Sequence, residues 1–212
     1  MSRVFIAVLA LVAAISAARA ETVPAPLHFI VKRNGTPIGT HTFAFHAEGD
    51  RLIVDIAIDI KVKLAFVTVY SYRLKGRETW QDGRLIAFES NTDDNGTKIE
   101  VRAHATAGGL EVTGSKVKGY VAPAATLTDS YWRAELVHKT QFVDVEDGNL
   151  ITLVSTPAGQ RTVDVGGQPV DTAIYKLSGE IEGEIGYTPD GEWTLLRFKS
   201  HGDDILYTRD AR

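Results

Sequence analysis

An alternation of apolar and charged residues between Arg51 and Lys63 limits what this chain can fold into. Side chains alternate between the two faces of a β-strand, whereas a helix repeats about every 3.6 residues. One face of such a strand meets water, and the other requires a second surface to cover it. The stretch therefore predicts an antiparallel sheet folded over one core. The apolar members of the alternation are Leu52, Val54, Ile56, Ile58, Ile60 and Val62.

Beyond Lys63 the alternation breaks, and the sequence LAFVTVYSYRL places bulky residues on both faces. A change of phase of this kind predicts a bend or a bulge within one long strand from Arg51 to Leu74. A sheet that curves until both faces are covered is the alternative.

Turn signals recur at short intervals along the rest of the chain, among them Asn34-Gly35, Asp82-Gly83 and Asn95-Gly96. Two-residue turns of this type join antiparallel strands. They predict an all-β fold of about a dozen strands in a single, strongly curved antiparallel sheet, either a half-barrel or a barrel. One short helix is expected over Thr126–Lys139, with Thr128 as its cap.

The first 20 residues have the features of a secretory signal peptide. Arg3 precedes an apolar run from Val4 to Ala18, and Ala18-Arg19-Ala20 provides a small-residue cleavage site. Residues 21–212 then form a single antiparallel β domain. The chain contains no cysteine, so neither a disulfide framework nor thiolate chemistry is available. Export without disulfides favours a periplasmic location.

The charge balance limits the classes of partner. The formal net charge is −4 at pH 7, and removal of Arg3 and Arg19 with the signal peptide makes it more negative. A nucleic-acid backbone requires a basic surface, so nucleic acid is not an expected partner. An anionic membrane is a poor partner by the same count. No second apolar run is long enough to span a membrane, and the sequence names no protein partner.

Catalytic and metal-binding patterns are weak. Asn91, Asp93, Asn95 and Gly96 match the first half of a calcium loop, but the closing carboxylate would fall at Arg102, so a polar hairpin turn is the expected structure. The six histidines lack a recognised metal spacing. No nucleophile motif such as G-x-S-x-G occurs. The sequence therefore predicts no catalytic residue, no metal site, no cofactor and no enzyme activity.

Aromatic residues offer a candidate ligand site. They occur at the phase break, in the neighbouring hairpin and in the expected helix. Such residues are either core or the lining of an apolar cavity in which tyrosine hydroxyls hold a polar group. The candidates are Phe66, Tyr70, Tyr72, Trp80, Tyr131 and Trp132.

A family resemblance runs along the chain from residue 21. It is carried, in order, by IVKRNGTPIGTHTFAF, by Glu78-Thr79-Trp80-x-Asp82-Gly83-x-Leu85, by NTDDNG, by Ser130-Tyr131-Trp132 and by Gly191-Glu192-Trp193. These motifs resemble an exported proteobacterial family catalogued only as a domain of unknown function. That family is remotely similar to envelope proteins with a curved antiparallel sheet around a helix, including periplasmic lipoprotein carriers. The resemblance implies the same fold and favours binding of an apolar ligand.

Three functions are therefore open. The first is a periplasmic binding protein that holds a lipid-like or other apolar molecule against the concave face of the sheet. The second is a structural or interaction module of the envelope, with a filled core and an apolar patch outside. The third, more remote, is a hydrolase, which would require a cleft with a perturbed histidine or carboxylate.

Overall fold

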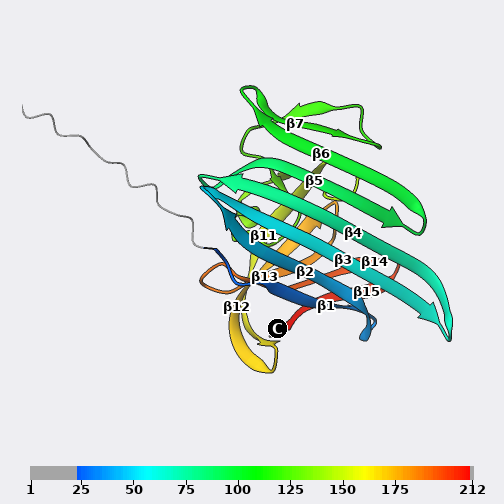
Figure 1. Ribbon diagram of the computed structural model, residues 1–212. Helices are drawn as coiled ribbons and strands as arrows, with labels where there is room; N and C mark the ends of the chain where they lie inside the picture. The colour runs from blue at the N-terminus through cyan, green and yellow to red at the C-terminus, as the bar shows by residue number, and fades with distance from the viewer. Residues whose placement is uncertain (1–22, 211–212) are drawn as a thin grey trace, which may run out of the picture.

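The computed structural model describes residues 23–210. They form one antiparallel sheet of 15 strands with a single parallel pair at one edge, which confirms the expected all-β class (Figure 1). The predicted signal peptide, residues 1–20, lies outside the described residues.

The chain runs through the sheet as two meanders that meet in the middle. The first meander consists of β1 (Leu27–Arg33), β2 (Thr36–Glu48), β3 (Arg51–Leu64), β4 (Val67–Gln81), β5 (Arg84–Asp94), β6 (Thr97–Thr106), β7 (Gly109–Gly114) and β8 (Tyr120–Ala122). The second consists of β9 (Leu127–Thr128), β10 (Gln141–Val143), β11 (Leu150–Val165), β12 (Gln168–Gly179), β13 (Gly183–Tyr187), β14 (Trp193–Ser200) and β15 (Asp203–Asp210). The first strand pairs with the last, with Val31 opposite Tyr207.

The stretch from Arg51 to Leu74 is a hairpin and not the single bent strand that the sequence predicts. The chain reverses at Ala65-Phe66, with Leu64 opposite Val67, and a bulge between Val62 and Lys63 accounts for the change of phase. The turn was missed because it lacks the Gly, Asn and Asp residues that usually mark one.

The expected helix is also shorter than predicted. Only Ala134–His138 is helical, as a 3-10 turn, η1. Thr128 lies in β9 and is not a helix cap, because the residue that precedes the turn is Arg133. The hydroxyl of Thr128 instead donates a hydrogen bond to the carboxylate of Glu78.

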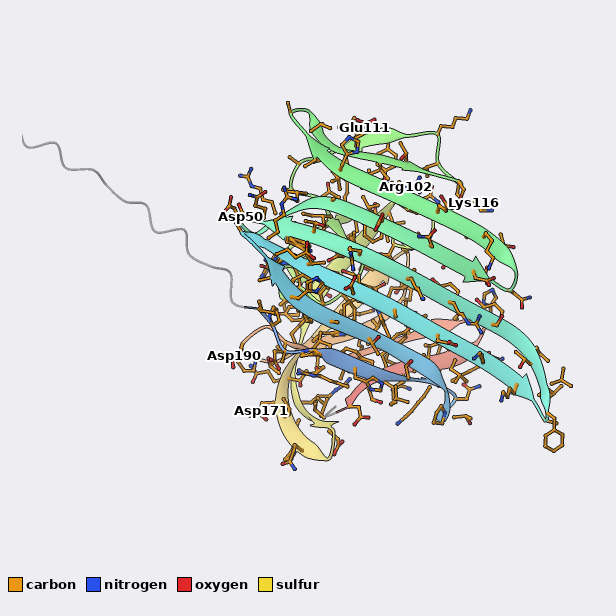
Figure 2. The ribbon with its side chains drawn as sticks, in the orientation of Figure 1. Asp50, Arg102, Glu111, Lys116, Asp171 and Asp190 are labelled. Atoms are coloured by element: carbon orange, nitrogen blue, oxygen red, sulfur yellow. The ribbon has the colours of Figure 1, made fainter. Side chains whose placement is uncertain are left out.

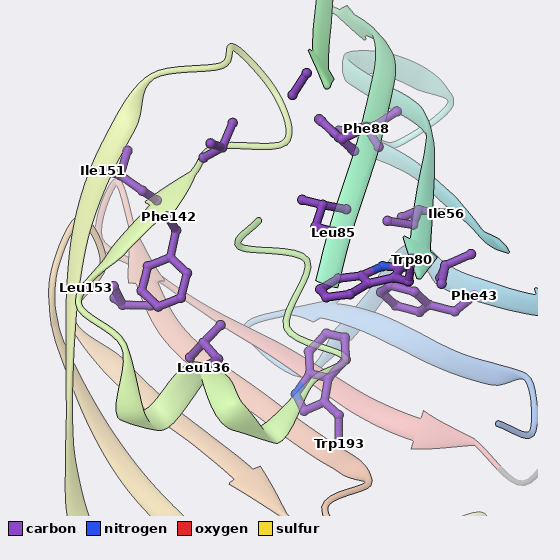
Figure 3. Packing of buried hydrophobic residues seen from close by; sticks show 14 of the residues in the cluster. Phe43, Ile56, Trp80, Leu85, Phe88, Leu136, Phe142, Ile151, Leu153 and Trp193 are labelled. Carbon is purple, nitrogen blue, oxygen red and sulfur yellow. The ribbon is translucent and has the colours of Figure 1, made fainter. Parts of the chain in front are cut away.

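The core fills one end of the curved sheet. Trp80 and Trp193 are fully buried there, and Leu136 of η1 packs inward between them and Phe142 (Figure 3). We call this the closed end. It carries the β2–β3 and β4–β5 turns, whereas the open end carries the β1–β2, β3–β4 and β14–β15 turns. Charged side chains such as Arg102 and Glu111 lie on the outer face (Figure 2).

Candidate ligand pocket

A pocket of about 640 Å³ lies at the open end. This volume falls within the range of small-molecule sites. Both meanders line the pocket: β3 contributes Ile58, Ile60 and Val62, and β15 contributes Ile205 and Tyr207. The pocket therefore depends on the pairing of the first strand with the last.

The pocket exists because the inward face of β3 is covered over only half its length. Val54 and Ile56 are buried on this face, whereas Ile58, Ile60 and Val62 are only half-buried. The segment that carries β9 and η1 packs against Trp80 at the closed end. Apolar side chains with the same periodicity thus form core at one end and the pocket wall at the other.

Two tyrosine–carboxyl pairs supply most of the polar groups on one side of the pocket. In these pairs Tyr70 lies near the carboxylate of Asp94, and Tyr72 lies near that of Glu146. Burial, together with these acids, raises the pKa of both phenols, so they remain protonated donors. Asp94 Oδ1 is buried and has no hydrogen-bond partner among the described residues. The pocket thus offers an unused acceptor beside an apolar wall.

Glu146 reaches the pocket from the loop between β10 and β11. The carboxylate of Asp144 holds this loop by accepting the backbone N–H of Glu146 at 2.6 Å and that of Asp147 at 3.1 Å. Asp129 accepts the N–H of Val145 at 2.9 Å. Burial raises the pKa of Asp129, Asp144 and Glu146. Of these three acids, Glu146 is the one that lines the pocket.

The other side of the pocket carries an ion pair. Arg33 Nε donates to Asp203 Oδ2 at 2.7 Å, and Asn34 Nδ2 donates to Asp203 Oδ1 at the same distance. This network joins the β1–β2 turn to β15. Because the charges of Arg33 and Asp203 neutralise each other, this side of the pocket does not require an ionic ligand.

A buried carboxylate, Glu78, organises the closed end. Its Oε2 accepts the indole N–H groups of Trp80 at 2.8 Å and of Trp132 at 2.7 Å. The guanidinium of Arg133 lies over both indoles, 4.5 Å from the ring centre of Trp80. With the Thr128 hydroxyl, these contacts fasten the β9–η1 segment to β4. Glu78 therefore acts as an anchor for the core.

The six predicted ligand residues are divided among three places. Tyr70 and Tyr72 line the pocket. Trp80 is buried, and Tyr131 and Trp132 pack against the core at the closed end, where Trp132 also borders a second cavity of about 490 Å³. Phe66 is fully exposed at the β3–β4 turn. The structure thus brings together only two of the six at the larger pocket.

His41 marks the boundary between the two ends. It pairs with Ile58 across β2 and β3, and its ring lies 4.5 Å from that of Phe43 and 5.9 Å from that of Tyr207. Neither ring nitrogen has a hydrogen-bond partner among the described residues. Burial lowers the pKa of His41 to about 3, so the imidazole is neutral at pH 7.

The calcium-like sequence forms a hairpin turn. Asp93 accepts the backbone N–H of Gly96 at 2.9 Å and the ammonium of Lys98 at 2.5 Å. The bond from Lys98 lowers the pKa of Asp93. Within residues 23–210 no group of three or more His, Cys, Asp or Glu side chains is placed to hold a metal. Over the same residues, no helix has the length and apolarity needed to cross a membrane.

A family model described as a domain of unknown function, DUF6134, matches residues 29–210. The chain belongs to this family. The match spans both meanders and the pocket, and its description states no activity. No curated protein matches the chain.

A solved structure shares the fold. It is the crystal structure of a beta-barrel-like protein of the domain of unknown function DUF1849 from Brucella abortus. The likeness covers 90% of this chain and 97% of that chain, with a TM-score of 0.62 and 11% sequence identity. At this identity the likeness concerns the fold alone.

Sequence reasoning missed Asp94, Glu146 and Tyr207 as pocket residues, because a nonlocal pairing and a loop bring them to the site. Glu78 was also missed, although a signal was present. It lies in the same strand phase as Leu74 and Trp80, which face the core. A carboxylate in the apolar phase of a strand indicates a buried, hydrogen-bonded acid.

Proposed function

We propose that the protein binds an apolar small molecule in the pocket at the open end. The observation that carries the proposal is an apolar pocket built by both meanders, with the buried, unpaired Asp94 Oδ1 in its wall. A buried acceptor without a partner costs free energy, and a ligand that donates a hydrogen bond would recover it. The site has a binding role and no catalytic step.

The chemistry of the wall favours a ligand with an apolar body and a hydrogen-bond-donating or cationic end. Asp94 and Glu146 would accept from that end, and the wall around Ile60 and Ile205 would contact the body. A carboxylate or phosphate end would be repelled by these acids. Lipid-like amines and alcohols are therefore the proposed class.

The proposed setting is the periplasm, reached through the signal peptide predicted in residues 1–20. This placement rests on the sequence. The sequence motifs also show a remote similarity to periplasmic lipoprotein carriers. That similarity supports the same location and an apolar ligand. The second candidate, an interaction module, is favoured by the exposed apolar tip at Phe66.

The proposal is tested by calorimetric binding measurements with three probes that share the same alkyl chain. The probes are dodecylamine, dodecanol and dodecanoic acid, each used as a monomer. The amine should bind most tightly and the acid most weakly. The Asp94→Asn variant should weaken amine binding about tenfold, because hydrogen bonds to charged groups contribute about 1.5–3 kcal/mol. Asp93→Asn, which alters the neighbouring outward carboxylate, is the matched control and should leave binding unchanged.

Two results would contradict the proposal. If no probe binds and native mass spectrometry of the purified protein shows no bound molecule, the pocket is not a ligand site. If the acid binds best, the assigned polarity of the ligand is wrong.

A further inference from the structure

The tip of the β3–β4 hairpin exposes a concentration of apolar side chains. Phe66 is 101% exposed and Leu64 is 72% exposed. Of the nine large hydrophobic residues exposed in the described part of the chain, five lie between positions 64 and 70. Scattered apolar residues are normal on a surface, but a contiguous exposed group marks a contact site.

The hairpin extends beyond its neighbours in the sheet (Figure 1). On one side, the β5–β6 turn reaches only to Ser71, whose carbonyl accepts the N–H of Asn95 at 2.8 Å. On the other side, the last pair between β2 and β3 joins Gly39 to Ile60. In the sheet, residues 62–70 therefore pair only with each other. Residues 63–69 are exposed, whereas Val62 and Tyr70 line the pocket.

The turn at this tip differs from the other hairpin turns in composition. Neighbouring turns use Asn34-Gly35, Asp82-Gly83 and Asn95-Gly96. Here the turn is Ala65-Phe66, and Ala65 adopts a left-handed φ of 54° that disfavours a residue with a side chain. The turn is thus apolar at a position where Gly or Asn would be more favourable.

The local charge is opposite to that of the whole protein. Residues 60–77 contain five Lys or Arg and no Asp or Glu, although Arg73 and Arg77 form ion pairs with Asp59 and Asp55 of β3. Lys61 and Lys63 lie just behind the apolar tip and border a groove of about 560 Å³. A third cation at this groove, Arg33, is already paired with Asp203. Lys63 has no ion-pair partner among the described residues, while Lys61 lies 3.5 Å from Asp59. Lysine side chains behind an apolar tip are placed as expected for contact with the phosphate layer of a membrane.

We propose that the β3–β4 tip inserts into the headgroup region of a phospholipid bilayer, with Lys61 and Lys63 at the level of the phosphates. A fluid bilayer can cover apolar side chains on both faces of a hairpin, whereas a flat protein surface can cover only one face. The contact is peripheral and independent of whether the pocket is filled. Because Val62 pairs with Tyr70 at the pocket rim, the tip would hold the pocket mouth at the bilayer surface.

Single labelled cysteines in the full chain test this contact, since the protein has no cysteine of its own. Thr68→Cys places an environment-sensitive nitrobenzoxadiazole label in the tip and keeps Phe66. Thr97→Cys places the same label at the neighbouring β5–β6 turn. With vesicles of phosphatidylethanolamine and phosphatidylglycerol, emission at position 68 should rise about threefold, and emission at position 97 should stay unchanged.

Substitution of Phe66→Ser and Leu64→Ser in the Thr68→Cys protein should weaken the vesicle response about tenfold or more, because two large apolar side chains are lost. Val121→Ser with Leu150→Ser, which removes apolar side chains exposed elsewhere, is the matched control. No rise at position 68, an equal rise at both labels, or a rise that follows protein concentration without vesicles would overturn the proposal. The last result would identify a second copy as the partner.

Discussion

The two ends of the sheet are built from the same strands but have different interiors. At the closed end, Ile56 is buried, and the carboxylate of Glu78 satisfies two indole N–H groups. At the open end, Ile60 on the same face of β3 lines a pocket. Strand periodicity therefore decides which way a side chain points, whereas the segment packed above it decides whether it becomes core.

The largest expected effect is at the anchor of the closed end. Glu78→Leu should lower the free energy of unfolding by about 3 kcal/mol or more, because two buried indole N–H groups lose their acceptor at about 1–3 kcal/mol each. Urea unfolding measures the change. Glu89→Leu, on an exposed position of β5, is the control and should change stability by less than about 0.5 kcal/mol. Equal effects would mean that Glu78 does not anchor the core.

A second experiment compares the two ends directly along one strand. Ile56→Ala should cost about 3 kcal/mol, as is usual for a cavity in a packed core. Ile60→Ala should cost about 1 kcal/mol, since its side chain is half-buried at the pocket. The same unfolding assay measures both. If Ile60→Ala were as costly as Ile56→Ala, the open end would be packed and the comparison would fail.

A pH-dependent change in stability is expected from His41 at the boundary. Its pKa is about 3 in the folded protein and about 6.5 in the unfolded chain. Below pH 6.5 the unfolded chain takes up a proton that the folded protein does not, so stability falls as the pH falls. Between pH 7 and pH 5 this loss is about 2 kcal/mol.

Comparison with His41→Leu isolates this contribution. The raised pKa values of Asp129, Asp144 and Glu146 act in the opposite direction, because these groups are protonated first in the folded protein. They are common to both proteins and cancel in the difference. The gap between the two unfolding free energies should therefore change by about 2 kcal/mol over this interval. An unchanged gap would indicate that water reaches His41 from the pocket.

Much of the fold could be predicted from local pattern. The alternation from Leu52 to Val62 identified the inward face of β3, and Asp82-Gly83 and Asn95-Gly96 both form turns. The Ala65-Phe66 turn could not be predicted, because its residues carry no turn signal. The helix was overestimated because Thr128, which looked like a cap, bonds instead to a carboxylate 50 residues earlier in the chain.

The candidate site was predictable only in part, because residues far apart in the sequence meet there. Tyr70 and Tyr72 were found because the phase break draws attention to them. Their partners Asp94 and Glu146 come from other elements, and Tyr207 arrives through the pairing of β15 with β1. Contacts of this kind depend on which strands become neighbours, and a single sequence does not encode that in its local periodicity.

The pairing of β1 with β15 also has a consequence for folding. Within each meander almost all strand pairs join neighbours in the chain, so each can form through short loop closures. The seam in which His28 faces Asp210 closes a loop of nearly the whole described chain. Loop closure of this length slows folding. The central strand pair of the sheet is therefore expected to form last, after the final residues of the chain are available.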